Sequence, residues 1–423
     1  MMFSHKLESS ASVSLQPSAL VATTVPRSDT GAREGRSVGA LIIGGDHGSL
    51  GVARSLGRRG IPVWFLTDDK IIAKFSRYTE RTVYWDGPEE LGAVEYLDGL
   101  AVAQGLTGWV LYPAGDREVK LVAQNHAALS HNFKLITPPW EITQIAADKH
   151  LMYERAAAIG VAYPKSYYPR NRAELLEIDY SFPLVLKPSL KEGMNALTQA
   201  KAWRIANRSE LLEKYDIAVA LIPAEHIVLQ EMVTGNGSAQ FSYTGVWKDG
   251  APVVSMIARR TRQYPIEFGT GTFVESIEQD DIEQASSAFL KSIDYSGLVE
   301  IEFKYDARDG KYKLLDVNPR VWTWNAIGER AGVDFAYVQW QLAMGESVAP
   351  SRGHAGAAWM YVSKDIAAGC MEMLAGITTP AAYLKSFRRG MGFAAFASDD
   401  PLPALTDFPL AIFRFCRQRL FGK

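Results

Sequence analysis

The chain has 423 residues, enough for two or three domains, and its 47% hydrophobic and 22% charged residues are typical of a globular protein. A formal net charge of −2 excludes a global electrostatic attraction to nucleic acid or to an anionic membrane. Only two cysteines are present, Cys370 and Cys416, which excludes a disulfide framework and a cysteine-based zinc site. This cysteine usage indicates a reducing compartment, so a cytoplasmic location is expected.

The N-terminal third of the sequence divides into a polar tail and a patterned segment. Residues 1–36 are rich in Ser, Thr, Ala and Arg with little periodicity, and they are expected to form a disordered tail. In residues 37–139, short apolar runs such as "PVWFL" and "GWVLYP" alternate with amphipathic helical patterns. Strands joined through helices pair in parallel, so this segment is predicted to be a Rossmann-like α/β domain.

A cluster of glycines follows the first predicted strand, in the stretch "IIGGDHGSLG". A dinucleotide site of the G-x-G-x-x-G type needs glycines where the backbone approaches a pyrophosphate. Counting back from Gly51 places Gly48 in register, but Asp46 stands where the first glycine should be. The glycines are therefore interpreted as a tightly packed strand–helix turn without a cofactor. A nicotinamide-dependent oxidoreductase that uses this domain is the disfavoured alternative.

The pattern changes after residue 139. Consecutive strands are now joined by short turns such as "KDG" and "RDG", which implies antiparallel pairing in an α+β region. Residues 346–423 form a C-terminal extension whose fold the pattern does not predict. Helices are predicted over residues 140–159, 208–220 and 281–293, and strands over residues 182–188, 226–233, 239–247, 252–261, 298–306 and 311–318.

The densest group of polar residues lies in "GLVEIEFKYDARDGKYKLLDVNPR". Alternate residues of a strand share a face, and the two strands in this stretch pair through a short turn. If the polar faces line one cleft, Glu302, Asp316 and Asn318 form an all-oxygen cluster that suits Mg²⁺. Arg320 would add a rigid donor fork for phosphate or carboxylate. An ordinary hairpin with solvated acids is the weaker alternative.

This hairpin resembles that of the ATP-grasp ligases, which hold metal ligands on adjacent antiparallel strands, the second within an acid-x-Asn-Pro-Arg run. Other segments that resemble this family lie upstream in the expected order: "ADKHLMYERAAAIGVAYP", "FPLVLKP" and "LQEMV". The segment "RRTRQYP…FGTGT" resembles a group of predicted carboxylate–amine ligases within it. The resemblance covers residues 38 to about 345. It implies a pre-ATP-grasp domain at residues 37–139 and an ATP-grasp domain at residues 140–345.

The resemblance also implies roles for the residues of each motif. Lys149 and Lys187 would contact the ATP phosphates, and a loop containing Lys191 and Gly193 would cover them. The glycine turn after the first strand would form a wall of the carboxylate or acceptor pocket. A hinge between subdomains would meet the adenine edge through Gln230, Glu231, Met232 and Val233.

Two further arginines lie near the predicted site. Arg260 and Arg262 are two residues apart on a predicted strand, so they are expected to share a face. Either could hold a γ-phosphate or an acyl-phosphate and act with Arg320 in catalysis, and a salt-bridged strand edge is the alternative for each. Three aromatic residues, Tyr264, Trp322 and Trp324, are candidates for an acceptor pocket, although core packing is the more common role at such spacing. His47 and Asp116 lie at strand ends, where helix caps and surface residues are common.

The family resemblance implies an ATP-dependent ligase that activates a carboxylate as an acyl-phosphate and joins it to an amine. Its cofactors would be ATP and Mg²⁺, with Mn²⁺ able to replace the magnesium. A non-catalytic ATP-binding regulator with the same fold is the alternative function. The expected partners are a small-molecule carboxylate and amine, with no nucleic acid, and a homodimer is an open option.

The last 15 residues, "PLAIFRFCRQRLFGK", contain Arg414, Arg417, Arg419 and Lys423 but no acid. Such a segment could form a basic amphipathic helix on a membrane surface. Its polar and apolar faces are not cleanly separated, so packing against the body of the protein is the favoured expectation.

Overall fold

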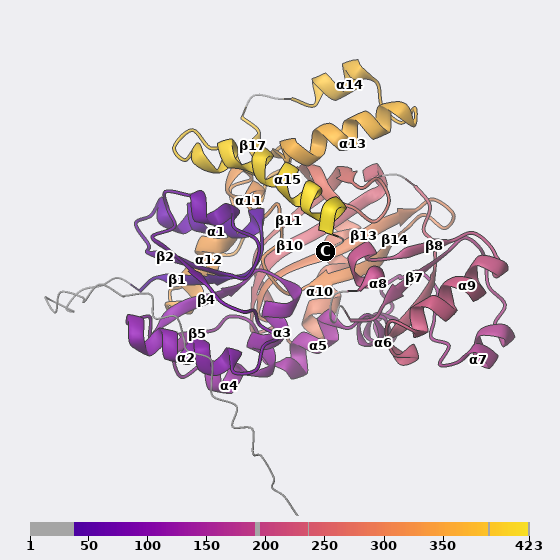
Figure 1. The fold of residues 1–423 in the computed structure, drawn as a ribbon, viewed down its shortest axis with the longest axis horizontal. Helices are drawn as coiled ribbons and strands as arrows, with labels where there is room; N and C mark the ends of the chain where they lie inside the picture. Colours follow the sequence, from indigo (N-terminus) through magenta and orange to yellow (C-terminus); the bar gives the residue numbers. More distant parts are fainter. Residues whose placement is uncertain (1–37, 191–194, 236, 388–389, 422–423) are drawn as a thin grey trace, which may run out of the picture. The chain divides into compact units, whose positions relative to one another are not determined.

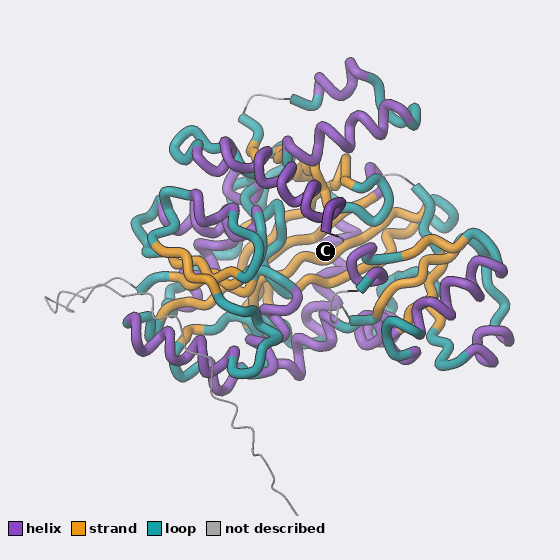
Figure 2. The backbone as a smooth tube through the Cα atoms, viewed as in Figure 1, coloured by secondary structure: helices purple, strands orange, loops and turns teal. Residues whose placement is uncertain are grey.

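The computed structural model describes residues 38–190, 195–235, 237–387 and 390–421 (Figure 1). The expected disordered tail therefore lies outside the described residues, and so do Lys191 and Gly193 of the expected phosphate-covering loop. Figure 2 shows helices, strands and loops over the described ranges.

An all-parallel sheet of order β3-β2-β1-β4-β5 forms the N-terminal part, which confirms the predicted Rossmann-like domain. Alternate strand residues enter two different cores. Leu41 and Ile43 pack on one face with α2, whereas Ile42 and Phe65 pack on the other with α1. The elements are β1 (Ala40–Ile43), α1 (His47–Gly57), β2 (Val63–Thr67), η1 (Ile72–Phe75), β3 (Arg81–Tyr84), α2 (Ala93–Gln104), β4 (Trp109–Pro113), α3 (Asp116–Gln124), α4 (His126–Leu129) and β5 (Phe133–Lys134).

The glycines after β1 serve close packing. Gly44 and Gly45 have φ of 68° and 77°, and a Cβ on Gly44 would lie 2.5 Å from the Glu118 carboxyl. On α1, a Cβ on Gly48 would lie 2.7 Å from the carbonyl oxygen of Trp322. These glycines bring α1 against the segment that follows the predicted metal-binding hairpin, and none of them is among the residues that line the two pockets described below.

A small antiparallel sheet of order β6-β9-β7-β8 follows, with α9 packed on it. The helix predicted over residues 140–159 is two helices, because the Asp148 side chain accepts hydrogen bonds from the N–H groups of His150 and Leu151 and starts a second helix there. The elements are α5 (Trp140–Ala147), α6 (Lys149–Ala158), β6 (Ser166–Tyr167), α7 (Arg172–Glu177), β7 (Leu184–Pro188), α8 (Ala196–Ala200), β8 (Trp203–Ile205), α9 (Arg208–Val219) and β9 (Ile227–Glu231).

A large sheet of order β14-β13-β10-β11-β12-β16-β17 forms the centre of the structure, and β15 pairs with β11. The turns predicted at "KDG" and "RDG" do join antiparallel pairs, β10 with β11 and β13 with β14. The large sheet shares one core with the N-terminal domain. Its elements are η3 (Gly237–Ala239), β10 (Gln240–Lys248), β11 (Ala251–Tyr264), β12 (Thr270–Ile277), α10 (Asp280–Ser292), β13 (Gly297–Asp306), β14 (Lys311–Asn318), α11 (Ile327–Arg330) and α12 (Phe335–Ala343).

Residues 346–423 extend the large sheet. β16 pairs with β12 in antiparallel register, and β17 pairs with β16. Three helices of this extension lie together in Figure 1, in yellow tones. The elements are β15 (Ser351–Arg352), β16 (Ala358–Met360), α13 (Val362–Leu374), α14 (Pro380–Lys385), β17 (Gly392–Phe393) and α15 (Leu402–Phe421).

The helix α15 is attached to the body through Asp407, which is buried and accepts hydrogen bonds from His47 and Ser363. Asp407 precedes the basic segment of residues 409–423. Among the described side chains of that segment, Leu410 packs on the core whereas Ile412 and Phe413 are exposed, so its expected packing against the body is not confirmed. Large apolar side chains remain exposed on α15: Leu402, Leu405, Phe408, Ile412 and Phe413. Within the described residues, no helix combines the length and apolar character that crossing a membrane requires.

Candidate active site

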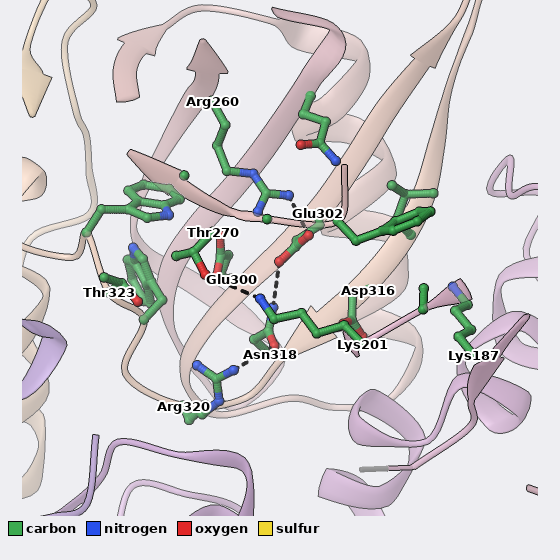
Figure 3. Close-up of a pocket in the computed structure, with 18 of the residues that line it drawn as sticks. Lys187, Lys201, Arg260, Thr270, Glu300, Glu302, Asp316, Asn318, Arg320 and Thr323 are labelled. Carbon is green, nitrogen blue, oxygen red and sulfur yellow. Dashed lines mark hydrogen bonds and ion pairs between the residues drawn. The ribbon is translucent and has the colours of Figure 1, made fainter. Parts of the chain in front are cut away.

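Two adjoining pockets open between the small sheet and the large sheet. The first, here called the polar pocket, has a volume of about 200 Å³, and the second, the apolar pocket, about 310 Å³. Both are lined by Lys187, Phe268 and Leu315, so they are continuous. The charged residues of the polar pocket are Lys149, Lys187, Lys201, Arg260, Glu300, Glu302, Asp316 and Arg320. All of them except Lys149 are labelled in Figure 3. The apolar pocket is lined by residues that include Val185, Met232, Val233, Ile266, Phe268 and Leu315.

The three predicted metal ligands lie together in the polar pocket. Glu302 and Asp316 are directly opposite each other on β13 and β14, because the hairpin register pairs them. The Asn318 side-chain amide donates a 3.2 Å hydrogen bond to Glu302 Oε1. Each carboxylate also meets a cation: Arg260 binds Glu302, and Lys149 Nζ lies 2.9 Å from Asp316 Oδ1.

Burial and neighbouring charges shift the pKa values of the two glutamates of β13 in opposite directions. Burial raises the pKa of the Glu300 carboxyl, and the nearby Glu302 carboxylate raises it further, to about 7. Burial would also raise the pKa of Glu302, but the adjacent Arg260 guanidinium outweighs it and lowers that pKa. Glu302 is therefore held as a carboxylate at neutral pH, as a metal ligand must be.

The two predicted phosphate-binding lysines are positioned by different elements. Lys149 begins α6 directly after the Asp148 cap, and its backbone N–H donates to the carbonyl of Ser189. Lys187 lies on β7, where its Nζ donates 2.9 Å hydrogen bonds to the Tyr153 hydroxyl and to Gln230 Oε1. Lys187 lines both pockets and lies at their junction.

The hinge after β9 borders the apolar pocket, as Gln230, Glu231, Met232 and Val233 all line it. The N–H groups of Glu231 and Met232 are already hydrogen-bonded to the carbonyls of Lys165 and Pro183. These two backbone donors therefore do not face a base edge. The side chain of Gln230 is held by Lys187 and by the Ser166 hydroxyl.

Sequence reasoning missed two parts of the polar pocket. Lys201 follows α8 and donates a 3.3 Å hydrogen bond to the Thr270 hydroxyl, from the loop side of the pocket. The β11–β12 loop supplies Phe268, which lines both pockets at a φ of 58°. A Cβ on Gly269 would lie 1.9 Å from the Pro265 carbonyl oxygen, so this loop conformation requires glycine there. In the sequence, the "FGT" run after "RQYP" was the pattern that could have indicated this pocket-lining loop.

The expectation that Arg260 and Arg262 share a face was wrong. Arg260 lies opposite Val274 and Arg262 opposite Phe273, because a bulge interrupts the register between them. Adjacent residues on β12 point to opposite faces, and so do these two arginines. Arg262 forms a buried ion pair with Asp365 of α13, at 2.8–3.0 Å, and stacks over Phe273. It is not among the lining residues of either pocket.

Arg320 faces the polar pocket and reaches the N-terminal domain. Its guanidinium donates to Asp116 Oδ1 at the start of α3, and to Asn318 Oδ1 at 3.1 Å. Asp116, which the sequence analysis placed at a strand end without a catalytic role, therefore positions Arg320. Trp322 and Trp324 line the pocket beyond Arg320, whereas Tyr264 is not among its lining residues.

The donor set of the hairpin fits a hard divalent cation. It consists of two carboxylates and one amide, all with oxygen donors, which is what Mg²⁺ prefers. Lys149 and Arg260 now occupy positions beside these oxygens, so the carboxylates are compensated by cations. Among the described residues, no cluster of three or more His, Cys, Asp or Glu side chains is arranged to hold a metal ion.

Comparison with known proteins adds to this geometry. The family model "Carbamoyl-phosphate synthase L chain, ATP binding domain" matches residues 253–350. A D-aspartate ligase of Enterococcus faecium is 25% identical over 226 residues, which cover 50% of this chain and 53% of that protein. A carbamoyl phosphate synthase large chain of Thermoanaerobacter pseudethanolicus is 24% identical over 328 residues, 73% of this chain and 29% of that protein. The chain spans about half, or less, of the length of these curated relatives.

Solved structures agree in fold over three quarters of the chain. An L-amino acid ligase from Bacillus licheniformis superposes with a TM-score of 0.57 at 18% identity, covering 73% of this chain and 75% of that one. A biotin carboxylase domain from Hydrogenobacter thermophilus, described in complex with MgADP and bicarbonate, gives 0.58 at 17% identity, covering 75% and 73%. The chain has the ATP-grasp fold. The residues that the family model matches include Arg260, both glutamates of β13 and the whole of β14.

Proposed function

We propose that this ATP-grasp protein is an ATP-dependent carboxylate–amine ligase. The observation that carries the proposal is the continuity of the two pockets: an apolar slot joins, at Lys187, a cavity that contains acids, lysines and arginines. An adenine needs a dry slot, and a triphosphate needs cations and a metal site next to it. A reacting carboxylate then has room beyond the phosphates.

ATP would lie across both pockets. The adenine would enter the apolar pocket between Val185 and Leu315, with the carbonyl of Glu231 and the N–H of Val233 at its edge. The phosphates would extend into the polar pocket, where Lys149, Lys187 and Lys201 offset their charge.

Glu302, Asp316 and Asn318 would hold Mg²⁺ between β13, β14 and the phosphates. When bound, Mg²⁺ offsets charge on the phosphate oxygens during transfer. Lys149 and Arg260, which now contact two of these side chains, would then move toward the anionic substrate.

The reaction proceeds in two steps. A carboxylate oxygen of the first substrate attacks the γ-phosphorus, the bond to the β–γ bridging oxygen breaks, and ADP leaves. The amine nitrogen of the second substrate then attacks the carbonyl carbon of the acyl-phosphate, phosphate leaves, and a proton passes from nitrogen to solvent. Arg260 and Arg320 would stabilise the negative oxygens of these states. No side-chain nucleophile is needed in this scheme.

The substrates would be small molecules, because the polar pocket holds about 200 Å³ and part of that volume receives the phosphates. Nucleic acid is not a proposed partner. A cytoplasmic location, a homodimer and replacement of Mg²⁺ by Mn²⁺ are further predictions for this ligase.

The decisive experiment measures ADP release with ATP and Mg²⁺ against pooled carboxylic acids and amino acids. ADP release should require both a carboxylate and an amine, and Asp316→Asn should abolish it. Asp309→Asn is the matched control, because Asp309 lies in the turn of the same hairpin, outside both pockets. ATP binding without turnover in any pool would favour a regulator, and a failure to bind ATP would refute the assignment of both pockets.

A further inference from the structure

The buried carboxylate of Glu300 differs from its neighbours in its partners. Its side chain is 4% exposed, and its Oε1 accepts a 3.0 Å hydrogen bond from the Ser242 hydroxyl. Over the described ranges, Glu302 and Asp316 each form an ion pair within 4.0 Å, and Glu300 forms none. A buried carboxylate without an ion pair is costly, and a cationic ligand group would offset that cost.

Glu300 lies farther from the apolar pocket than the Glu302–Asp316 pair does. The hairpin register places Glu300 opposite Asn318, two residues along each strand from Glu302 and Asp316. At about 3.3 Å per residue, this step moves about 7 Å along the strands. It leads away from Leu315, which lines the apolar pocket, and toward Arg320 and Trp322.

Two indole rings border this end of the polar pocket. Trp322 and Trp324 are 1% and 2% exposed, and their rings meet edge to face with centroids 5.8 Å apart. The Trp322 Nε1 has no hydrogen-bond partner among the described residues. Indole faces attract cations, and an unpaired indole N–H can donate to an oxygen of a ligand.

We propose that Glu300, Trp322 and Trp324 form the amine subsite, and that this subsite takes a compact primary amine in its ammonium form. The inference rests on the proposed ligase function and names the class of its second substrate. Glu300 holds the ammonium group, which loses one proton to solvent before the nitrogen lone pair attacks the acyl-phosphate, and the indoles enclose the carbon atoms next to it. The small volume of the pocket, shared with phosphates, favours an amine of amino-acid size.

The test compares Glu300→Gln with the unchanged chain for two nucleophiles: the amino acid that supports most ADP release, and hydroxylamine, which is uncharged at neutral pH. Glu300→Gln should lower kcat/KM for the amino acid by about 10- to 100-fold through KM. The fall in kcat/KM should be several-fold smaller for hydroxylamine, because hydroxylamine has no ammonium group for Glu300 to hold, and the ATP dissociation constant should stay within about 2-fold. Glu300→Asp, which keeps the charge, should recover part of the amino-acid kcat/KM.

The outcomes separate this inference from the proposed function. Unchanged amino-acid KM in Glu300→Gln, with normal ADP release, overturns the subsite and leaves the ligase intact. An altered Mg²⁺ requirement or weaker ATP binding in Glu300→Gln also overturns it, because Glu300 would then be a metal ligand. If the unchanged chain releases no ADP with hydroxylamine or any amino acid, the ligase proposal fails and the subsite with it.

Discussion

Arg320 and Asp116 form an ion pair between the ATP-grasp domain and the N-terminal domain, although 204 residues separate them in the chain. Arg320 follows the last strand of the predicted metal-binding hairpin, and Asp116 begins α3 of the parallel domain. The orientation of a guanidinium in the polar pocket therefore depends on a residue of another domain.

This ion pair predicts a positioning effect. Asp116→Asn should lower kcat by about 10- to 100-fold, because a small displacement of Arg320 disturbs the alignment of the reacting groups. The ATP dissociation constant should change little, since Asp116 is not among the residues that line the polar or apolar pocket. Steady-state kinetics and calorimetric ATP titration measure the two effects. Asp98→Asn, at a contact with Asn132 outside both pockets, is the control; equal losses in both variants would contradict a specific role.

The buried pair of Arg262 and Asp365 predicts a stability effect without a catalytic one. Asp365 is fully buried and also accepts a 2.8 Å hydrogen bond from Thr272. Asp365→Ala should lower the free energy of unfolding by about 3–5 kcal/mol, because it leaves a buried guanidinium unpaired. Urea denaturation measures the change. Asp216→Asn, at an exposed pair with Arg172, should cost less than about 1 kcal/mol.

His47 predicts a pH dependence of stability. Burial lowers its pKa, but Asp46 and Asp407 outweigh burial, and the net pKa of the folded protein is raised. A raised folded pKa means that the charged pair stabilises the protein fully below the ordinary value of about 6.5, and that this stabilisation is lost as pH rises through the folded pKa.

Denaturation midpoints of the unchanged chain and of His47→Gln should therefore differ most at acidic pH and converge at alkaline pH. His131→Gln, at an exposed histidine, is the control for the substitution itself. A gap that widens with rising pH would contradict the assigned direction.

The glycines of α1 and α2 predict opposite effects of the same substitution. Gly48→Ala should destabilise the protein by about 1–3 kcal/mol, because its Cβ would meet the Trp322 carbonyl oxygen at 2.7 Å. Gly99→Ala on α2 has no atom within 4 Å of the new Cβ and should stabilise by about 0.4–1 kcal/mol. Thermal unfolding of both variants checks the contrast. A neutral Gly48→Ala would show that α1 can shift away from Trp322.

Local patterns predicted the parts of the fold that local interactions determine. The alternation of strands and helices up to residue 139 predicted a parallel sheet, and the short "RDG" turn predicted the β13–β14 pair. The register of a hairpin follows from its turn, so the predicted pairing of these two strands was enough to bring Glu302 and Asp316 together.

Long-range pairing was not visible in the sequence. The bulge in β11 depends on the register with β12, so the spacing of Arg260 and Arg262 suggested a shared face that does not exist. Lys201 reaches the polar pocket only because α8 and β8 fold beside β7, and the Arg320–Asp116 pair requires two domains to meet. The strands of the C-terminal extension are two or three residues long, too short for a periodic pattern.

The pairing of β16 with β12 has a practical consequence for work on this protein. A polypeptide that stops at residue 345, where the family resemblance ends, would keep every pocket-lining residue except Ile377. It would nevertheless uncover the backbone donors and acceptors of β12, and it would remove Ala358, Met360 and Met391, which pack against Phe273. A bare strand edge beside exposed apolar side chains is a template for self-association. Expression of a polypeptide that stops at residue 345 should therefore yield aggregates, because residues 346–423 supply the strand that covers the edge of β12.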